Sequence, residues 1–177
     1  MSETAAMVTA LDTLFVLARA VIDPNDSSTY EPAFEHLSRA SDLVNTRSPT
    51  NANYVRCVSG AFHHLAGCLY QNDRYGVAIR FLREGCVLGG RALDLKGQRD
   101  DSEETPEAVW TALKEQLYRR WELLAVCYLK TGEKKVSLLL FGKEYKDVTA
   151  AIICRWPSKL LSNVSRLSLT MKQSHLK

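Results

Sequence analysis

Apolar residues recur through the first 130 positions at steps of three and four, which is the period of one face of an α-helix. Three stretches share one spacing, in which a first large residue is followed by others three, four and seven positions later. We predict that these residues line the buried faces of three helices: Leu14, Leu17, Ala18 and Val21; Phe62, Leu65, Ala66 and Leu69; Trp121, Leu124, Ala125 and Tyr128.

A second pattern follows the first two of these stretches. Its members are Tyr30, Ala33, Phe34, Leu37 and Ala40 in one copy, and Tyr75, Ala78, Ile79, Leu82 and Gly85 in the other. The two copies share one constant offset, whereas the preceding helices are three residues further apart, so the first turn must be longer. The small residues at matching positions would let paired helices approach closely. A helix, a turn and a second helix that recur in this way are typical of internal repeats.

This arrangement resembles the tetratricopeptide repeat. We expect an all-α chain of antiparallel helical hairpins stacked as a short right-handed solenoid, with units at about 8–45, 53–92 and 106–135. An ordinary helical bundle is the alternative, because its buried faces have the same spacing.

Residues at the ends of the predicted helices agree with these boundaries. Asp23-Pro24-Asn25-Asp26-Ser27 is rich in helix breakers, and Gly132 marks a turn. The remaining signals are a capping box at Ser28 and Glu31, an N-cap at Asp73, a helix stop at Gly89-Gly90, and a helix start at Thr105-Pro106 that would open a helix over about 106–130. We read the acidic stretch 97–105 as a loop, with a docking or modification site at Ser102 as the alternative.

The repeat pattern stops after Lys135. Ser137 stands where the pattern has Ala, and Trp156-Pro157 interrupts any helix there. Residues 1–130 carry 14 Lys/Arg against 17 Asp/Glu, whereas residues 131–177 carry nine against three. We therefore separate a domain at 1–135 from a divergent basic tail at 136–177. A foreign end from a retained intron or mispredicted exon would explain this tail. An amphipathic segment is the alternative. We expect proteolysis to remove the tail before it cuts the domain.

Three segments resemble the helical region of fungal separase, over roughly residues 8–135. They are Asn53–Gln71, Arg74–Gly89 and Gln116–Gly132, and the stretch Leu11–Val44 is similar too. The resemblance implies a superhelical scaffold from a cysteine endopeptidase that cleaves the cohesin kleisin in mitosis, when sister chromatids separate. It also implies a protein partner, either a securin-like inhibitor or the remainder of a separase-like protein, and a location in the nucleus and cytoplasm.

The resemblance does not extend to the family's protease domain, so it assigns no catalytic residue to this chain. Cys57, His64 and Cys68 could share one helical face, but a helix offers no oxyanion hole beside them. His63 and His64 are adjacent rather than spaced as zinc ligands, and no phosphate-binding loop is present. We expect no cofactor, no metal and no small-molecule substrate, and the family's activity leaves the enzyme question open.

Protein binding is the function that the sequence favours. The first helix of each repeat would line a groove, at which we predict a partner-binding set: Asp12, Arg19, His63, Tyr70, Gln71, Arg119, Glu122 and Lys130. These residues could equally be solvated or pack within a larger protein. A free-standing adaptor that binds peptides is the alternative function. Glu3 and Asp12 interrupt any signal peptide, and we expect neither membrane nor direct nucleic-acid binding.

Overall fold

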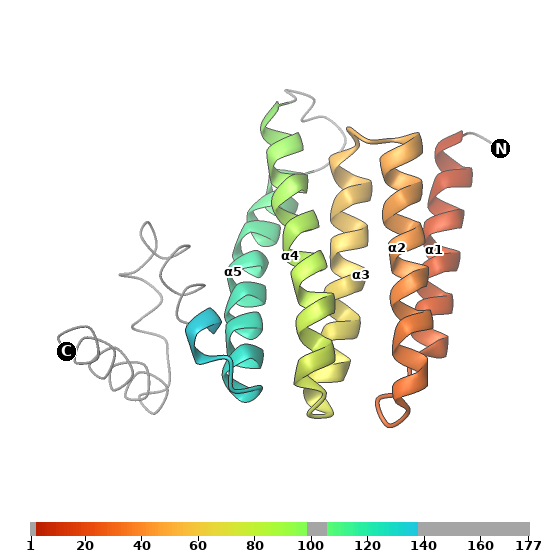
Figure 1. Cartoon of the computed structure of the whole chain (residues 1–177). Helices are drawn as coiled ribbons and strands as arrows, with labels where there is room; N and C mark the ends of the chain where they lie inside the picture. Colours follow the sequence, from red (N-terminus) through yellow and green to blue (C-terminus); the bar gives the residue numbers. More distant parts are fainter. Residues whose placement is uncertain (1–2, 99–105, 138–177) are drawn as a thin grey trace. The chain divides into compact units, whose positions relative to one another are not determined.

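A computed structural model of the chain describes residues 3–98 and 106–137 (Figure 1). Within these ranges the chain is helical and contains no strand, which confirms the all-α prediction. The elements are α1 (Glu3–Val21), the short 3-10 helix η1 (Ser27–Thr29), α2 (Tyr30–Arg47), α3 (Ala52–Gln71), α4 (Tyr75–Gln98) and α5 (Glu107–Lys130). The chain divides into two compact units, Met1–Glu133 and Lys134–Lys177, and the account below concerns the first. Predictions for 99–105 and for 138 onward lie outside the described residues.

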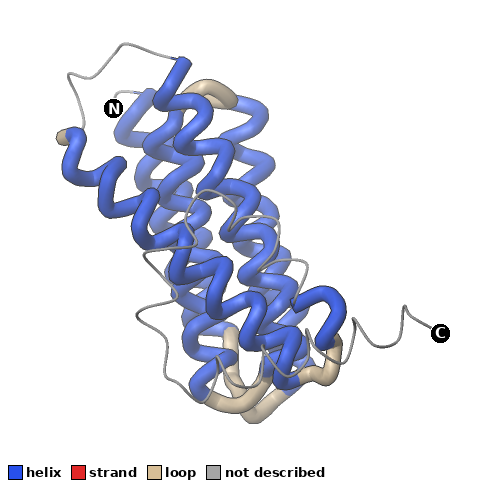
Figure 2. Tube along the Cα trace, turned by 90° about the vertical axis from the view of Figure 1, so that its left-hand side faces the viewer, coloured by secondary structure: helices blue, strands red, loops and turns tan. Residues whose placement is uncertain are grey.

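Consecutive helices of this unit run in opposite directions, as Figure 1 shows, and each packs against the next. In addition, α1 contacts α3, and α3 contacts α5. Arginines of α4 reach α2, so these two helices are neighbours as well. The side view in Figure 2 shows the same long helices joined by short turns where the chain is described. Helices α1, α3 and α5 therefore form one layer, and α2 and α4 form the other.

Local hydrogen bonds explain where several helices begin. The Asn51 side chain accepts a hydrogen bond from the backbone N–H of Tyr54, 3.1 Å away, and so caps α3. The Asp26 carboxylate accepts one from the backbone N–H of Ser28 at 2.9 Å, which begins η1. The predicted capping box is wrong, because Ser28 lies in η1 and α2 begins only at Tyr30. The Glu31 carboxylate instead binds Arg80 of α4.

The predicted helix stop at Gly89-Gly90 is also wrong, since α4 continues to Gln98. Gly89 is buried where α4 meets two other helices. A Cβ at this position would lie 2.4 Å from Cδ2 of Leu117 and 3.0 Å from Oγ of Ser59. The glycine therefore serves close helix packing rather than helix termination. Gly132, in contrast, follows α5 with φ of +86°, in agreement with the predicted turn.

Three phenylalanines from α2, α3 and α4 pack together, two of them buried and Phe34 half-buried. The Phe34 ring meets Phe81 and Phe62 edge-on, with centroids 5.1 and 5.5 Å apart. Most predicted core positions are buried, but Leu14, Leu17, Val21 and Trp121 are not. Leu17 is 41% exposed, and Trp121 is only half-buried. The buried tryptophan of α5 is Trp110, which is 5% exposed. It lies 11 residues before Trp121, about three helical turns away, and so outside the repeated pattern of 121–128.

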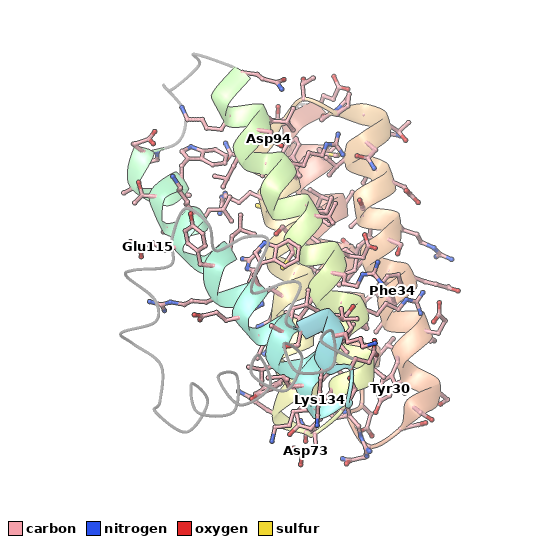
Figure 3. The ribbon with its side chains drawn as sticks, turned by 60° about the vertical axis from the view of Figure 1, so that its left-hand side comes forward. Tyr30, Phe34, Asp73, Asp94, Glu115 and Lys134 are labelled. Atoms are coloured by element: carbon pink, nitrogen blue, oxygen red, sulfur yellow. The ribbon has the colours of Figure 1, made fainter. Side chains whose placement is uncertain are left out.

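Hydrogen bonds also hold the first hairpin against the second. The carbonyl of Pro24, in the α1–α2 turn, accepts bonds from the Tyr30 hydroxyl at 2.7 Å and from Nε of Arg74 at 2.8 Å. At the other end of α4, Arg91 donates to the Asn45 side chain and to the Pro49 carbonyl. Figure 3 shows Tyr30 and Phe34 on α2 and Asp73 at the α3–α4 turn. The two hairpins are thus joined at both ends of α4.

Helix α1 is the most apolar of the described helices. By length and composition alone it could cross a membrane, a criterion that core helices and signal sequences also meet. Met7, Leu11 and Ala18 face inward, whereas Val16 is 65% exposed and Val8 is 43% exposed. The helix therefore packs on α2 and α3 with one face and presents an apolar face to its surroundings.

Candidate functional site

A hollow of about 410 Å³ lies between α3 and α5 and is called the α3–α5 hollow below. Its α3 side is formed by Gly60, His63, His64, Gly67, Cys68 and Gln71. Its α5 side is formed by Gln116 and Arg120. Two glycines on α3 leave room for the hollow, because a Cβ at Gly60 or Gly67 would meet nothing within 4 Å. All the lining residues are either neutral or basic.

The central feature of this site is a buried arginine. Arg120 is only 3% exposed, although arginine is almost never fully buried unless it is paired. Its Nη1 donates to Oγ of Ser59 at 2.6 Å, and its Nη2 donates to Oε1 of Gln116 at 3.2 Å. Nε has no hydrogen-bond partner. Burial lowers the pKa of Arg120, and the nearby Cys86 acts in the opposite direction.

Ser59 connects this arginine to the helix behind it. Its hydroxyl is fully buried and donates to the carbonyl of Gly85 on α4 at 2.6 Å. Because the proton points at α4, the oxygen's lone pairs are free to accept from Arg120 on α5. A single hydroxyl on α3 therefore links three helices through polar contacts inside an otherwise apolar core.

His63 lies at the edge of the same hollow and is half-buried. Burial, then the positive charge of Arg120, then His64 lower the pKa of His63 to about 4. The imidazole is therefore neutral near pH 7. Its Nδ1 is buried and has no hydrogen-bond partner. A neutral imidazole adds hydrogen-bonding capacity to the hollow without adding a second charge.

A second hollow, of about 340 Å³, lies between α1 and α3 and is called the α1–α3 hollow. It is lined mainly by apolar side chains, among them Phe15, Val16, Leu37 and Leu65, with Arg19 at its edge. Gly60 and His64 line both hollows. The two hollows therefore adjoin along the layer formed by α1, α3 and α5.

The structure brings together part of the predicted partner-binding set. His63 and Gln71 line the α3–α5 hollow, and Arg19 lines the α1–α3 hollow. Tyr70 stands edge-on to Tyr75, 5.4 Å between ring centroids, and Nζ of Lys130 lies 5.7 Å from the centroid of Tyr75. Three further members lie on α1 and α5 but line neither hollow: Asp12 and Arg119, which are exposed, and Glu122, which is half-buried.

Sequence reasoning missed Ser59, Gln116 and Arg120. The sequence held a signal for two of them, because Ser59 lies on the buried face of α3 and Arg120 lies on the buried face of α5. A polar residue at an apolar position needs a buried partner, and each is the partner of the other. The partnership joins positions 61 residues apart, so spacing within one helix could not reveal it.

The two cysteines considered for catalysis line different hollows, and His64 lines both. Cys57 is exposed and lines the α1–α3 hollow, while Cys68 lines the α3–α5 hollow. Burial raises the pKa of the Cys127 thiol to about 11, so that thiol is protonated near pH 7. Among the residues that the structure describes, no group of three or more His, Cys, Asp or Glu could hold a metal ion. What the described residues form here is a polar hollow with one buried cation.

No family model, curated protein or solved structure matches this chain.

Proposed function

We propose that this chain is a non-catalytic, tetratricopeptide-like scaffold that acts by binding protein, and that it corresponds to part of the helical region of a separase-like endopeptidase. In this proposal α1–α2 and α3–α4 are two successive repeats of a right-handed solenoid, and α5 is the first helix of a third. The resemblance of the segments at 53–71, 74–89 and 116–132 supports the family. It would place the chain in the nucleus and cytoplasm, in the release of sister chromatids.

The observation that carries the protein-binding role is the layer of α1, α3 and α5. Two adjoining hollows lie along it, and they differ in chemistry. One has apolar walls and the other has polar walls around a buried cation. Such a combination suits an extended segment whose successive side chains differ in polarity, since apolar contact supplies affinity and a few polar groups supply orientation.

The proposed partner is either a securin-like inhibitor or the remainder of a separase-like protein. Titration calorimetry of the purified chain against each of these proteins would test this. The informative variant is Gly60→Leu, which fills both hollows at a position where a Cβ has open space. We expect it to weaken binding about tenfold or more while leaving the helical content unchanged.

Gly76→Leu is the matched control, because Gly76 is exposed on α4 and a Cβ there also meets nothing within 4 Å. Equal binding by both variants would place the interface elsewhere, and no binding by the unmodified chain would refute the assignment. The same preparation should leave a kleisin peptide uncleaved. Cleavage that disappears in Cys57→Ala or Cys68→Ala would show that the chain is catalytic after all.

A free-standing adaptor that binds peptides is the second candidate. The observation that favours it is the α3–α5 hollow itself, whose polar residues could contact a short peptide. An adaptor would bind short peptides without the rest of a separase-like protein, so peptide binding combined with failure of both calorimetric titrations would favour it.

A further inference from the structure

We propose that the α3–α5 hollow binds an acidic side chain of an extended peptide, with the guanidinium of Arg120 as its counter-charge. The ligand group is an anion that a carboxylate of Asp or Glu, or a phosphate on Ser or Thr, would supply. This inference rests on the proposed protein-binding role of the α1, α3 and α5 layer and names the chemistry of the partner.

The first argument is charge. Removing a guanidinium from water costs several kcal/mol unless an anion compensates for it. None of the three ion pairs recorded among residues 3–98 and 106–137 includes Arg120. Glu115, a nearby acid on α5, is exposed and points away from the helices (Figure 3). Within the described part of the chain, the positive charge of Arg120 has no carboxylate beside it.

The second argument is hydrogen bonding. A guanidinium has five N–H donors, and the two contacts to Ser59 and Gln116 use two of them. Both acceptors are neutral, so they orient the group without cancelling its charge. Arginine and a carboxylate or phosphate form paired, charge-assisted bonds that are about twice as strong as neutral ones. Arg120 is therefore already fixed in place and keeps donors for an anion.

The third argument is the surroundings of the hollow. No acidic residue lines it, so an entering anion meets no like charge. His64, Gln71 and Gln116 add side-chain donors around Arg120. Since an anion bound there would favour the protonated form of the neighbouring imidazole, it would also raise the pKa of His63.

The fourth argument favours a peptide over a free ion. The α3–α5 hollow adjoins the apolar α1–α3 hollow through Gly60 and His64. In an extended segment, a residue two positions from the acidic one points to the same side and could place an apolar side chain against Phe15 and Leu65 there. A free phosphate would use the cation but leave these apolar walls empty. An extended segment with one acidic and one apolar side chain uses both.

The experiment is an NMR titration of the full chain, labelled with ¹⁵N, with four peptides of sequence acetyl-Leu-Gly-X-Gly-Leu-amide. X is Glu, phosphoserine, Gln or Ser. We expect the Nε–Hε signal of Arg120 to shift with the Glu or phosphoserine peptide, and the neutral counterparts to bind about 10- to 100-fold more weakly. Whichever charged peptide binds more tightly identifies the source of the anion. Inorganic phosphate alone tests whether the apolar contacts matter.

Two variants with matched controls locate the site. Gly67→Leu fills the hollow where a Cβ has open space and leaves Arg120 in place, so it should abolish the shift of the Arg120 signal, whereas Gly76→Leu should not. Arg120→Met should reduce binding of the charged peptides to that of the neutral ones, whereas Arg83→Met, which removes an exposed charge on α4, should leave it unchanged.

Equal shifts with charged and neutral peptides, or unchanged binding by Gly67→Leu, would overturn the proposal. If no peptide shifts the Arg120 signal but a separase-like partner still binds, the anion site is wrong and the scaffold role stands. If the charged peptides bind and neither protein partner does, the anion site stands and the separase-like role fails.

Discussion

Arg120 and Ser59 occupy positions at which the helix patterns of their own segments would place apolar side chains. Each is tolerated because the other is present, and the hydroxyl of Ser59 serves both Arg120 and the carbonyl of Gly85. A buried polar group without a partner costs about 1–3 kcal/mol, so the two residues should be energetically coupled.

Double-mutant analysis tests this coupling. Ser59→Ala should lower the free energy of unfolding by about 1–3 kcal/mol, because it leaves a buried cation with one fewer acceptor. Arg120→Met should be close to neutral or stabilising, since an apolar chain of similar length replaces an uncompensated charge. In the Arg120→Met background the effect of Ser59→Ala should shrink by about 0.5–3 kcal/mol in denaturant melts. Additive effects would contradict the contact.

His63 should make stability depend on pH. Its pKa is about 4 in the folded protein against a usual 6.5, so between these values the unfolded chain binds the extra proton. The contribution of His63 to stability should therefore fall as the pH is lowered from about 6.5 towards 4 and level off below 4. Burial and the charges of Arg120 and His64 are the cause. The difference in unfolding free energy between the unmodified protein and His63→Gln, measured across this range, should shrink as the pH falls. A difference that is constant with pH would refute the shift.

At the scale of helices, tertiary packing determines the role of residues that look like helix-ending signals in the sequence. A pair of glycines normally ends a helix, yet α4 passes through Gly89 and Gly90 without interruption. Gly89 sits against Leu117 and Ser59, whereas a Cβ at Gly90 would meet nothing within 4 Å. The two glycines thus look alike in sequence and differ in their contacts.

The two positions should respond in opposite ways to alanine. Gly90→Ala should raise the free energy of unfolding by about 0.5–1 kcal/mol, because alanine restricts the unfolded chain and favours the helix. Gly89→Ala should lower it by about 1–3 kcal/mol, since Leu117 must move and Ser59 is held by its hydrogen bonds. Thermal melts of both variants check this, and a stabilising Gly89→Ala would show that α4 and α5 are not packed as described.

At the scale of the whole molecule, residues 1–133 form one compact unit. Its two hairpins are joined by a shared aromatic cluster, by Arg74, which precedes α4, and by Arg80 and Arg91 on α4. These interactions link residues 42 to 50 positions apart, which makes unfolding of one hairpin without the other unfavourable.

A chain that ends at Glu133 should therefore keep its helical signal and unfold in one cooperative transition. Its melting temperature should lie within about 5 °C of that of the full chain, because the contacts described for the five helices are all retained. Circular dichroism and calorimetry would measure this. A broad, non-cooperative melt would show that residues beyond 133 are required for the fold.

The sequence by itself determined the helices and most of their buried faces. Apolar residues spaced three and four positions apart identify the buried face of a helix, because the positions that share one face depend only on the geometry of that helix. The prediction of a helix over about 106–130 is confirmed by α5 for that reason. The same local rule placed Leu17 and Trp121 in the core, where the structure leaves one exposed and the other half-buried.

Only the tertiary structure decided the candidate site. The candidate site brings together Arg120 of α5, Ser59 of α3 and the two glycines of α3 that leave room for the hollow. They meet because α3 contacts α5 and both helices pack against α4. The cost of burying a charge depends on which groups of other helices reach it, and the role of a glycine depends on which helix passes it. Neither quantity is set by spacing along one segment. A buried arginine that pairs with no carboxylate of residues 3–98 and 106–137 therefore becomes visible only when the helices are packed.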